Sequence, residues 1–135
     1  MVSEKAEQTD VNPITMKILV FDDEKDVCFL YELILKKKGH QVETRTDACS
    51  LLEDVKDVKP DVIFMDNSMP GVTGYEATMK LKGQEGFQHI PVIFCSANWN
   101  ADYLAKAAQA DYFLPKPFSV NDIEQSLRIV QSRAA

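Results

Sequence analysis

MKILVFDD, residues 16–23, is a short apolar run that ends at two adjacent acids, Asp22 and Asp23. The length and β-branched content of the run favour a buried β-strand. A helical pattern follows at residues 25–38, with apolar side chains at the spacing of one core-facing stripe: Val27, Leu30, Tyr31 and Ile34. This stretch therefore predicts a strand, a pair of acids at the strand's end, and a helix that packs back on the strand.

The same alternation continues along the rest of the chain. Further strands are predicted at residues 40–44, 62–65, 91–96 and 112–114. Further helices are predicted at residues 47–58, 75–82 and 102–110, and from Ser119 onward. Five strand–helix units in alternation predict an α/β fold, a doubly wound five-stranded parallel sheet with helices on both faces. The nearly continuous apolar strands suit a sheet that is buried on both sides.

Composition limits the classes of function. The chain has 135 residues, 45% of them hydrophobic, and a net charge of −6, which argues against a nucleic-acid or acidic-membrane module. No apolar run approaches the ~20 residues of a membrane span, so no membrane insertion is expected. We expect a flexible tail at residues 1–15 and one domain at residues 16–135. Without CxxC spacing, three cysteines are interpreted as reduced, packed thiols of a cytoplasmic protein: Cys28, Cys49 and Cys95.

Four of the five predicted strands end in side chains suited to phosphate and cation chemistry. In order, they are Asp22 with Asp23, Asp66, Ser96 and Lys116. Because ligands of open α/β sheets bind at the carboxyl ends of the strands, these groups are expected to converge. Three carboxylates in one crevice repel one another and require a cation. Their oxygen atoms suit Mg²⁺, with Mn²⁺ as an alternative.

Such a crevice also suits phosphoryl transfer. A carboxylate can act as the nucleophile and form an acyl phosphate. The three oxygens of the transferred group then need charge compensation, which a metal ion, an ammonium group and a hydroxyl can share. Lys116 and Ser96 fit the ammonium and hydroxyl roles.

These residues carry a resemblance to a known family. Five motifs occur in the family's order between Met16 and Arg133: Phe21-Asp22-Asp23, Met65-Asp66, Met69-Pro70 with Gly74, Ser96-Ala97, and Lys116-Pro117-Phe118. Together they resemble the CheY-like receiver domain of two-component response regulators, in a stand-alone single-domain form. The resemblance implies a flavodoxin-like (βα)₅ fold. It also implies a signalling protein that catalyses only its own phosphorylation and dephosphorylation.

The resemblance further assigns site roles. Asp66 would accept a phosphoryl group from a phosphohistidine of a sensor histidine kinase or a histidine phosphotransfer protein. Asp22, Asp23, Asp66 and the backbone carbonyl of Ser68 would hold Mg²⁺. The phosphoryl group would be engaged by Ser96 and Lys116, with Phe113 as the aromatic switch. The small Ala97 would give access to the phosphorylation pocket, and the remaining accessory residues are Asn98, beside the phosphate, and Pro117.

Several positions depart from the family pattern. Phe113 stands where Tyr is commoner, Thr73 where many relatives carry Asp, and Gln109 where Gly is usual before the fifth strand. The interval between Ser96 and Lys116 is about two residues short for the family, which affects the fourth helix and the usual output face.

Other interpretations remain open at this point. A phosphorylation-independent interaction module would need none of the acids. An Asp-nucleophile phosphatase would carry a second Asp two residues after the first, where Ser68 and Glu24 stand instead. A flavin carrier would place a hydroxyl- or Gly-rich phosphate loop where Asp22, Asp23 and Glu24 lie.

The chain's interactions are predicted from its length and from the resemblance. With the receiver pattern running nearly to Ala135, no output domain is expected. The signal would therefore pass to a separate protein target, or the chain would serve as a phosphate relay or sink. A homodimer is left open. Phe29 and Trp99 lie off the core pattern; isolated exposure is the simpler interpretation, and contact with a partner is the sharper one.

Overall fold

The computed structural model describes residues 15–134, so the predicted tail lies almost wholly outside the described residues. Five strands are present in this range: β1 Lys17–Phe21, β2 Gln41–Arg45, β3 Val62–Asp66, β4 Val92–Ser96 and β5 Tyr112–Pro115. They alternate with the helices α2 Lys25–Lys37, α3 Leu51–Val58, α4 Gly74–Lys82, α5 Asp102–Ala107 and α6 Val120–Ala134. A single 3₁₀ turn, Trp99–Ala101, precedes α5, and the side chain of Trp99 is not among those described.

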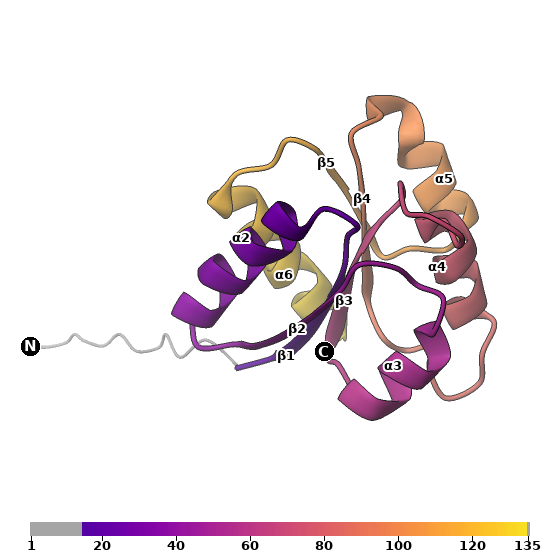
Figure 1. Ribbon diagram of the computed structural model, residues 1–135, viewed down its shortest axis with the longest axis horizontal. Helices are drawn as coiled ribbons and strands as arrows, with labels where there is room; N and C mark the ends of the chain where they lie inside the picture. The colour runs from indigo at the N-terminus through magenta and orange to yellow at the C-terminus, as the bar shows by residue number, and fades with distance from the viewer. Residues whose placement is uncertain (1–14, 135) are drawn as a thin grey trace, which may run out of the picture.

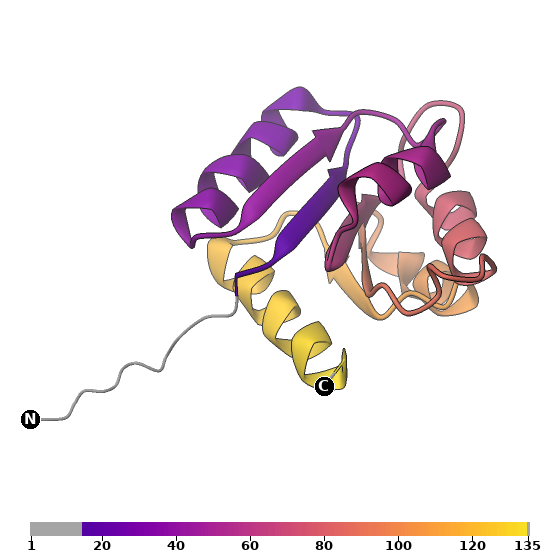
Figure 2. The ribbon, with the colours of Figure 1, turned by 90° about the horizontal axis from the view of Figure 1, so that it is seen from below.

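The strands form one sheet in the order β2-β1-β3-β4-β5, and every pairing is parallel. Figure 2 shows β1 and β2 side by side, running in the same direction. The chain moves outward from β1 to β2, then returns past β1 to β3, so the strand order reverses between β1 and β3. This confirms the predicted doubly wound sheet. It also places a switch point, where ligands of such folds bind, at the carboxyl ends of β1 and β3.

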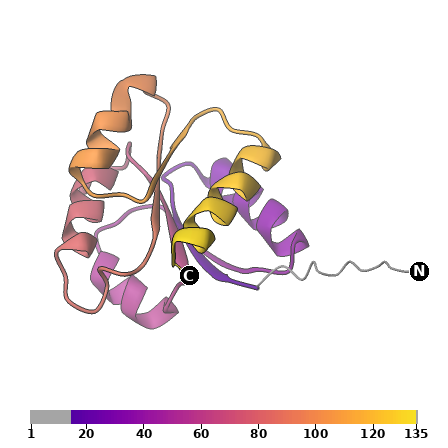
Figure 3. The same cartoon turned by 180° about the vertical axis from the view of Figure 1, so that it is seen from behind.

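Helices cover both faces of the sheet (Figures 1 and 3). One face packs on α2 and α6 through a core that includes Tyr31, Leu35 and Leu127. The opposite face packs on α3, α4 and α5. Adjacent residues of β5 divide between the two faces as strand alternation predicts, since Tyr112 lies on the α2–α6 side and Phe113 on the α5 side.

Three apolar or thiol side chains differ from their predicted burial. Leu30 and Val120 are exposed, although both were placed on core-facing stripes. The core-facing stripe of α2 instead runs through Cys28, Tyr31 and Leu35, and Val27 and Ile34 are half-buried at its margins. The stripe is therefore rotated by part of a turn from its predicted position. Cys49 is exposed, whereas Cys28 and Cys95 are buried as expected.

Local hydrogen bonds explain where the helices begin. The helix expected from Asp47 begins four residues later, because the Asp47 side chain accepts the Cys49 N–H and forms a turn. The last helix is capped as expected, since the Ser119 hydroxyl accepts the Asp122 N–H while the Asp122 carboxylate accepts the Ser119 N–H.

The fourth helix, α5, is only six residues long and ends earlier than predicted. Gln109 adopts a left-handed conformation with φ of 66°. The Gln109 N–H donates to the Lys106 carbonyl, and the Ala110 N–H donates to the Ala105 carbonyl. This is a Schellman ending, which favours glycine at the left-handed position. Gln109 therefore retains the turn at a position that favours glycine and adds backbone strain there.

Candidate functional site

Three carboxylates meet at the switch point of the sheet. Asp22 directly follows β1, Asp66 ends β3, and Asp23 is the next residue after Asp22. One oxygen from each lies within 4.8 Å of the others. Asp22 and Asp66 are 1% and 4% exposed, whereas Asp23 is open to solvent. Two ionisable carboxyls are therefore buried side by side, with a third at the entrance.

Lys116, in the loop between β5 and α6, joins the two buried acids. Its Nζ lies 2.8 Å from Asp22 Oδ2 and 2.8 Å from Asp66 Oδ1. Burial lowers the pKa of Lys116, but the hydrogen bonds and the negative charges of the two acids outweigh burial and raise that pKa above its ordinary value. The ammonium group is therefore held charged between two strands that are distant in sequence.

One ammonium group does not compensate all of the negative charge. Burial raises the pKa of Asp66 to about 6; Lys116 opposes the rise, while the charges of Asp22 and Asp23 add to it. The Lys116 ammonium group therefore offsets only part of the burial and of the charges of the two neighbouring acids, which together keep the pKa of Asp66 raised. A divalent cation at this place would supply the missing charge.

Backbone groups fix the orientation of the acids. The Ser68 N–H donates to Asp66 Oδ2 at 3.1 Å, and the Glu24 N–H donates to Asp22 Oδ1 at 3.0 Å. The buried Cys28 thiol on α2 donates to the Asp22 carbonyl at 3.2 Å. Each buried carboxylate therefore has one oxygen held by its own loop and the other by Lys116.

The loop after Asp66 is closed by two residues, of which one was missed at the sequence level. A Cβ on Gly74 would lie 2.3 Å from the Asp66 carbonyl oxygen, so only glycine fits there. Asn67, which was not singled out, accepts the Tyr75 N–H through its side chain and anchors the start of α4. The sequence pattern that indicates such an anchor is an amide side chain placed between the acid that ends a strand and the start of the next helix. Thr73 forms a reciprocal capping box with Glu76 at the start of α4.

Within the described residues, the side chains of the predicted switch residues make no hydrogen bond to the side chains of this cluster, although the Lys116 N–H donates to the Ser96 carbonyl at 2.9 Å. Ser96 ends β4 and is buried, and its hydroxyl accepts the Asn98 N–H at 3.0 Å. Phe113 is half-buried, with its ring centre 6.5 Å from that of Phe94. The accessory residues Ala97, Asn98 and Pro117 are exposed around the site. Thus Asp22, Asp23, Asp66 and Lys116 form the core of the site, with the Ser96 hydroxyl turned toward its own loop.

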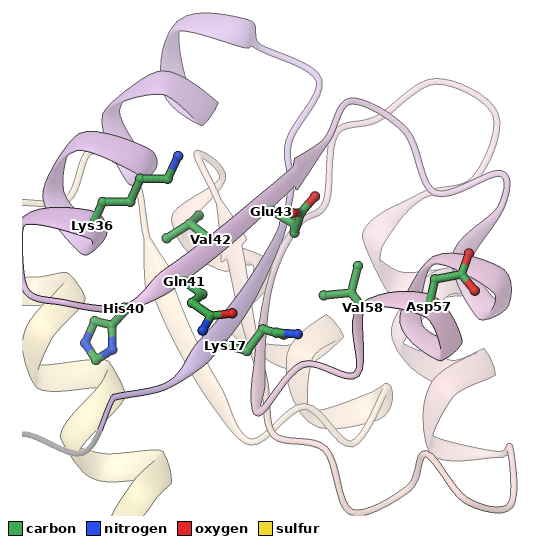
Figure 4. A pocket seen from close by; sticks show the side chains of 8 residues that line it. All are labelled: Lys17, Lys36, His40, Gln41, Val42, Glu43, Asp57 and Val58. Atoms are coloured by element: carbon green, nitrogen blue, oxygen red, sulfur yellow. The ribbon is translucent and has the colours of Figure 1, made fainter.

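A separate cavity of about 610 Å³ lies over β2 between α2 and α3 (Figure 4). Its charged lining is mixed, since it includes both Lys17 and Lys36 and both Glu43 and Asp57. None of the acids of the cluster lines this cavity. Its balanced charge favours neither an anion nor a cation, so the acid cluster remains the candidate site.

Residues 18–128 match the family model described as the response regulator receiver domain. The chain belongs to this family. Protein PilG from Pseudomonas aeruginosa is 34% identical over 110 residues, which cover 80% of this chain and 82% of that protein. A transcriptional regulatory protein of alkaline phosphatase synthesis, PhoP from Bacillus subtilis, is 28% identical over 87% of this chain but over 49% of its own length. The match thus spans about four fifths of one relative's length and about half of the other's.

Solved receiver structures share the fold. The chemotaxis response regulator CheY4 of Vibrio cholerae is 26% identical and superposes with a TM-score of 0.80, covering 86% of this chain and 98% of that one. The receiver domain of sensor histidine kinase PA1611 from Pseudomonas aeruginosa is 25% identical with a TM-score of 0.78, over 87% and 98% of the two chains. In that structure a magnesium ion is coordinated in the active-site cleft.

Membership of the receiver family defines the chain as a signalling module rather than a classical enzyme. Between residues 15 and 134, no helix combines the length and the apolar character needed to cross a membrane.

Proposed function

We propose that this receiver accepts a phosphoryl group on Asp66 from a phosphohistidine of a sensor histidine kinase or a histidine phosphotransfer protein. The observation that carries the proposal is the buried Asp66 carboxylate, 2.8 Å from the Lys116 ammonium group and next to two other acids. The domain would occupy residues 16–135 and act in the cytoplasm on a separate protein target.

The acid cluster fits a hard divalent cation. Its donors are carboxylate oxygens within 4.8 Å of one another, and Mg²⁺ prefers oxygen ligands of this kind, with Mn²⁺ as a substitute. Asp22, Asp23, Asp66 and the Ser68 backbone carbonyl would hold the ion. When bound, it would neutralise charge on the cluster and on the incoming phosphoryl group.

The proposed reaction uses the chain's own groups at each atom. An Asp66 carboxylate oxygen attacks phosphorus, the bond from phosphorus to the histidine nitrogen breaks, and that nitrogen leaves with the electron pair. The Lys116 ammonium group, already beside Asp66, compensates the negative charge of the phosphoryl oxygens. The surrounding loops would exclude water from the site, which strengthens the attraction between the Lys116 ammonium group and the phosphoryl oxygens.

The response would pass from Ser96 to Phe113. In the present arrangement the Ser96 hydroxyl accepts a bond from its own loop. Turning toward a phosphoryl oxygen would vacate space into which the half-buried Phe113 ring moves. Ala97 would leave the pocket accessible, while Asn98 and Pro117 would shape its entrance. Phosphorylation thus biases a two-state equilibrium of the last two strand–helix units.

The outer face of α2 supplies a contact surface for the phosphodonor. Phe29, Leu30 and Leu33 lie together at i, i+1 and i+4 and are 59%, 52% and 53% exposed. The helix begins beside Asp22 and Asp23, so a protein docked on it stands close to the acids. Clustered exposed apolar side chains of this kind favour the partner-contact interpretation of Phe29 over isolated exposure.

The test is treatment with a phosphodonor and Mg²⁺, followed by intact-mass spectrometry. Wild type should gain one phosphoryl group, as should Asp57→Ala, which removes an exposed acid on α3. Asp66→Ala should gain none; the same gain in Asp66→Ala would disprove the site assignment. Multiple turnover on a phosphomonoester would favour the phosphatase interpretation. A complete lack of phosphorylation, with retained partner binding, would favour a phosphorylation-independent module.

A further inference from the structure

A buried polar pair lies directly beside the phosphorylation site and has no role in the proposed reaction. The Tyr31 hydroxyl on α2 is 3.5 Å from the Cys95 sulfur, and Cys95 is the register partner of Asp66 on the neighbouring strand. The Tyr31 hydroxyl and the Cys95 thiol share this hydrogen bond, and the Cys95 thiol also donates to the Ile93 carbonyl at 3.7 Å. The hydroxyl end of Tyr31 is therefore fixed next to the acids.

Electrostatics agree with this position. Burial, the Cys95 contact and the negative charges of Asp22 and Asp66 all raise the pKa of Tyr31 well above its ordinary value. Burial raises the pKa of Cys95 to about 12. Both groups stay protonated at neutral pH, so they act as fixed donors and not as nucleophiles or bases.

The ring of Tyr31 reaches the loop that carries Lys116. Its centre lies 5.5 Å from that of Phe118 and 4.9 Å from that of Phe64, both in tilted geometry. Phe118 is only two residues after Lys116. Tilted aromatic pairs at these separations contribute beyond the area they bury. Tyr31 on α2 thus contacts the centre of the sheet through Phe64 and the Lys116 loop through Phe118.

We propose that Tyr31 is a positioning residue for Lys116 and acts through its ring, which holds Phe118 in the Lys116 loop. This inference rests on the proposed phosphoryl transfer and adds the means by which the Lys116 ammonium group reaches both acids. Holding the Lys116 ammonium group at two oxygens costs conformational freedom of the loop as well as of the side chain, and a loop already fixed by the Phe118 contact has less of that freedom to lose. The same helix contacts the Asp22 loop through Cys28, so α2 supports both sides of the cluster.

Four variants test this role with acetyl phosphate and saturating Mg²⁺, under conditions where each variant is fully folded. Tyr31→Leu should slow phosphorylation of Asp66 by about tenfold, because small displacements of a charge-compensating group are costly. Tyr31→Phe keeps the ring and should stay within about twofold of wild type. Leu35→Ala, in the same core cluster one turn further along α2, controls for loss of packing and should react at the wild-type rate. Phe118→Leu removes the other ring and should repeat the Tyr31→Leu effect, even if Tyr31→Leu fails to fold.

A double-mutant cycle separates positioning from general damage. In a Lys116→Met background, Tyr31→Leu should cause no further slowing, because its effect passes through Lys116. Nitrogen-15 NMR gives a readout without phosphorylation: the Lys116 ammonium signal, protected by its two bonds, should be lost in Tyr31→Leu and kept in Tyr31→Phe and Leu35→Ala. The inference would be overturned if Tyr31→Leu and Phe118→Leu both kept the wild-type phosphorylation rate and the Lys116 ammonium signal. It would also be overturned if Tyr31→Leu slowed phosphorylation as much in the Lys116→Met background as in the wild type. A wild-type chain that gains no phosphoryl group instead overturns the proposed function.

Discussion

Replacing Asp66 by asparagine should stabilise the metal-free protein, and the gain should depend on pH. Asparagine is close in shape to the protonated acid and carries no charge. The Asp66 pKa is raised from 3.8 to about 6 in the folded chain. Below about pH 4 the carboxyl is protonated in both folded and unfolded states and has no cost. Between about pH 4 and pH 6 the unfolded chain releases this proton while the folded chain keeps it, so stability falls across this range. Above about pH 6 the folded chain carries a buried anion and the loss is complete.

The size of this effect follows from the shift. About two pKa units at about 1.4 kcal/mol each give at most about 3 kcal/mol. Because solvent reaches the cluster on the side of the exposed Asp23, screening reduces this to about 2 kcal/mol at pH 8. At pH 5 only about half of the interval between the unfolded and folded pKa values has been crossed, and the gain in unfolding free energy should fall to about 1 kcal/mol.

Urea denaturation with a chelator present, at pH 5 and pH 8, measures these differences. Asp57→Asn on α3 is the control and should show no such pH-dependent gain. Added Mg²⁺ should stabilise wild type more than Asp66→Asn and narrow the gap between them. The reasoning is refuted if Asp66→Asn is less stable than wild type at pH 8, or if its gain is equal at both pH values.

Three further substitutions probe the same loops by urea denaturation. Gly74→Ala should lower the free energy of unfolding by about 2–3 kcal/mol, because its Cβ would lie 2.3 Å from the Asp66 carbonyl oxygen. Gly83→Ala is the control and should lower it clearly less, because the nearest atom there is 3.3 Å away. Equal losses in the two variants would contradict the steric argument. Lys116→Met should lower the free energy of unfolding by about 2 kcal/mol at pH 8 and by less at pH 5, where Asp66 takes up a proton. A loss that does not depend on pH would show that the negative charge of Asp66 is not the cause. Gln109→Gly should stabilise by about 0.5–1 kcal/mol by relieving the left-handed strain, and Gln109→Val should destabilise; no difference between the two would argue against strain.

The order of strands and helices was readable from the chain because it depends on local pattern. Apolar runs ending in acids predicted the strands, and the strand-to-helix alternation predicted a parallel sheet, which is confirmed by the strand order and pairing. Helix ends were harder to place. The start of α3 depends on the Asp47 turn, and the end of α5 depends on the left-handed Gln109.

The direction in which α2 faces could not be read from spacing alone. Leu30 and Tyr31 are neighbours in the same apolar stripe, yet Leu30 is exposed and Tyr31 is buried. The choice is made by Phe64 on β3 and Phe118 before α6, which contact the Tyr31 ring from distant parts of the chain. Cys49 likewise gave no local sign that its side chain would face solvent.

At the acid cluster, sequence and tertiary structure determined different things. The sequence by itself determined which chemical groups end the strands and, because parallel strands share one carboxyl edge, that acids and a lysine would gather there. Only the tertiary structure decided that Asp22 and Asp66 are buried while Asp23 is open, and that Lys116 bonds to both buried acids. The physical reason is that burial and ion pairing depend on atoms brought together from positions up to 94 residues apart, and a pattern of neighbours along the chain does not contain those distances.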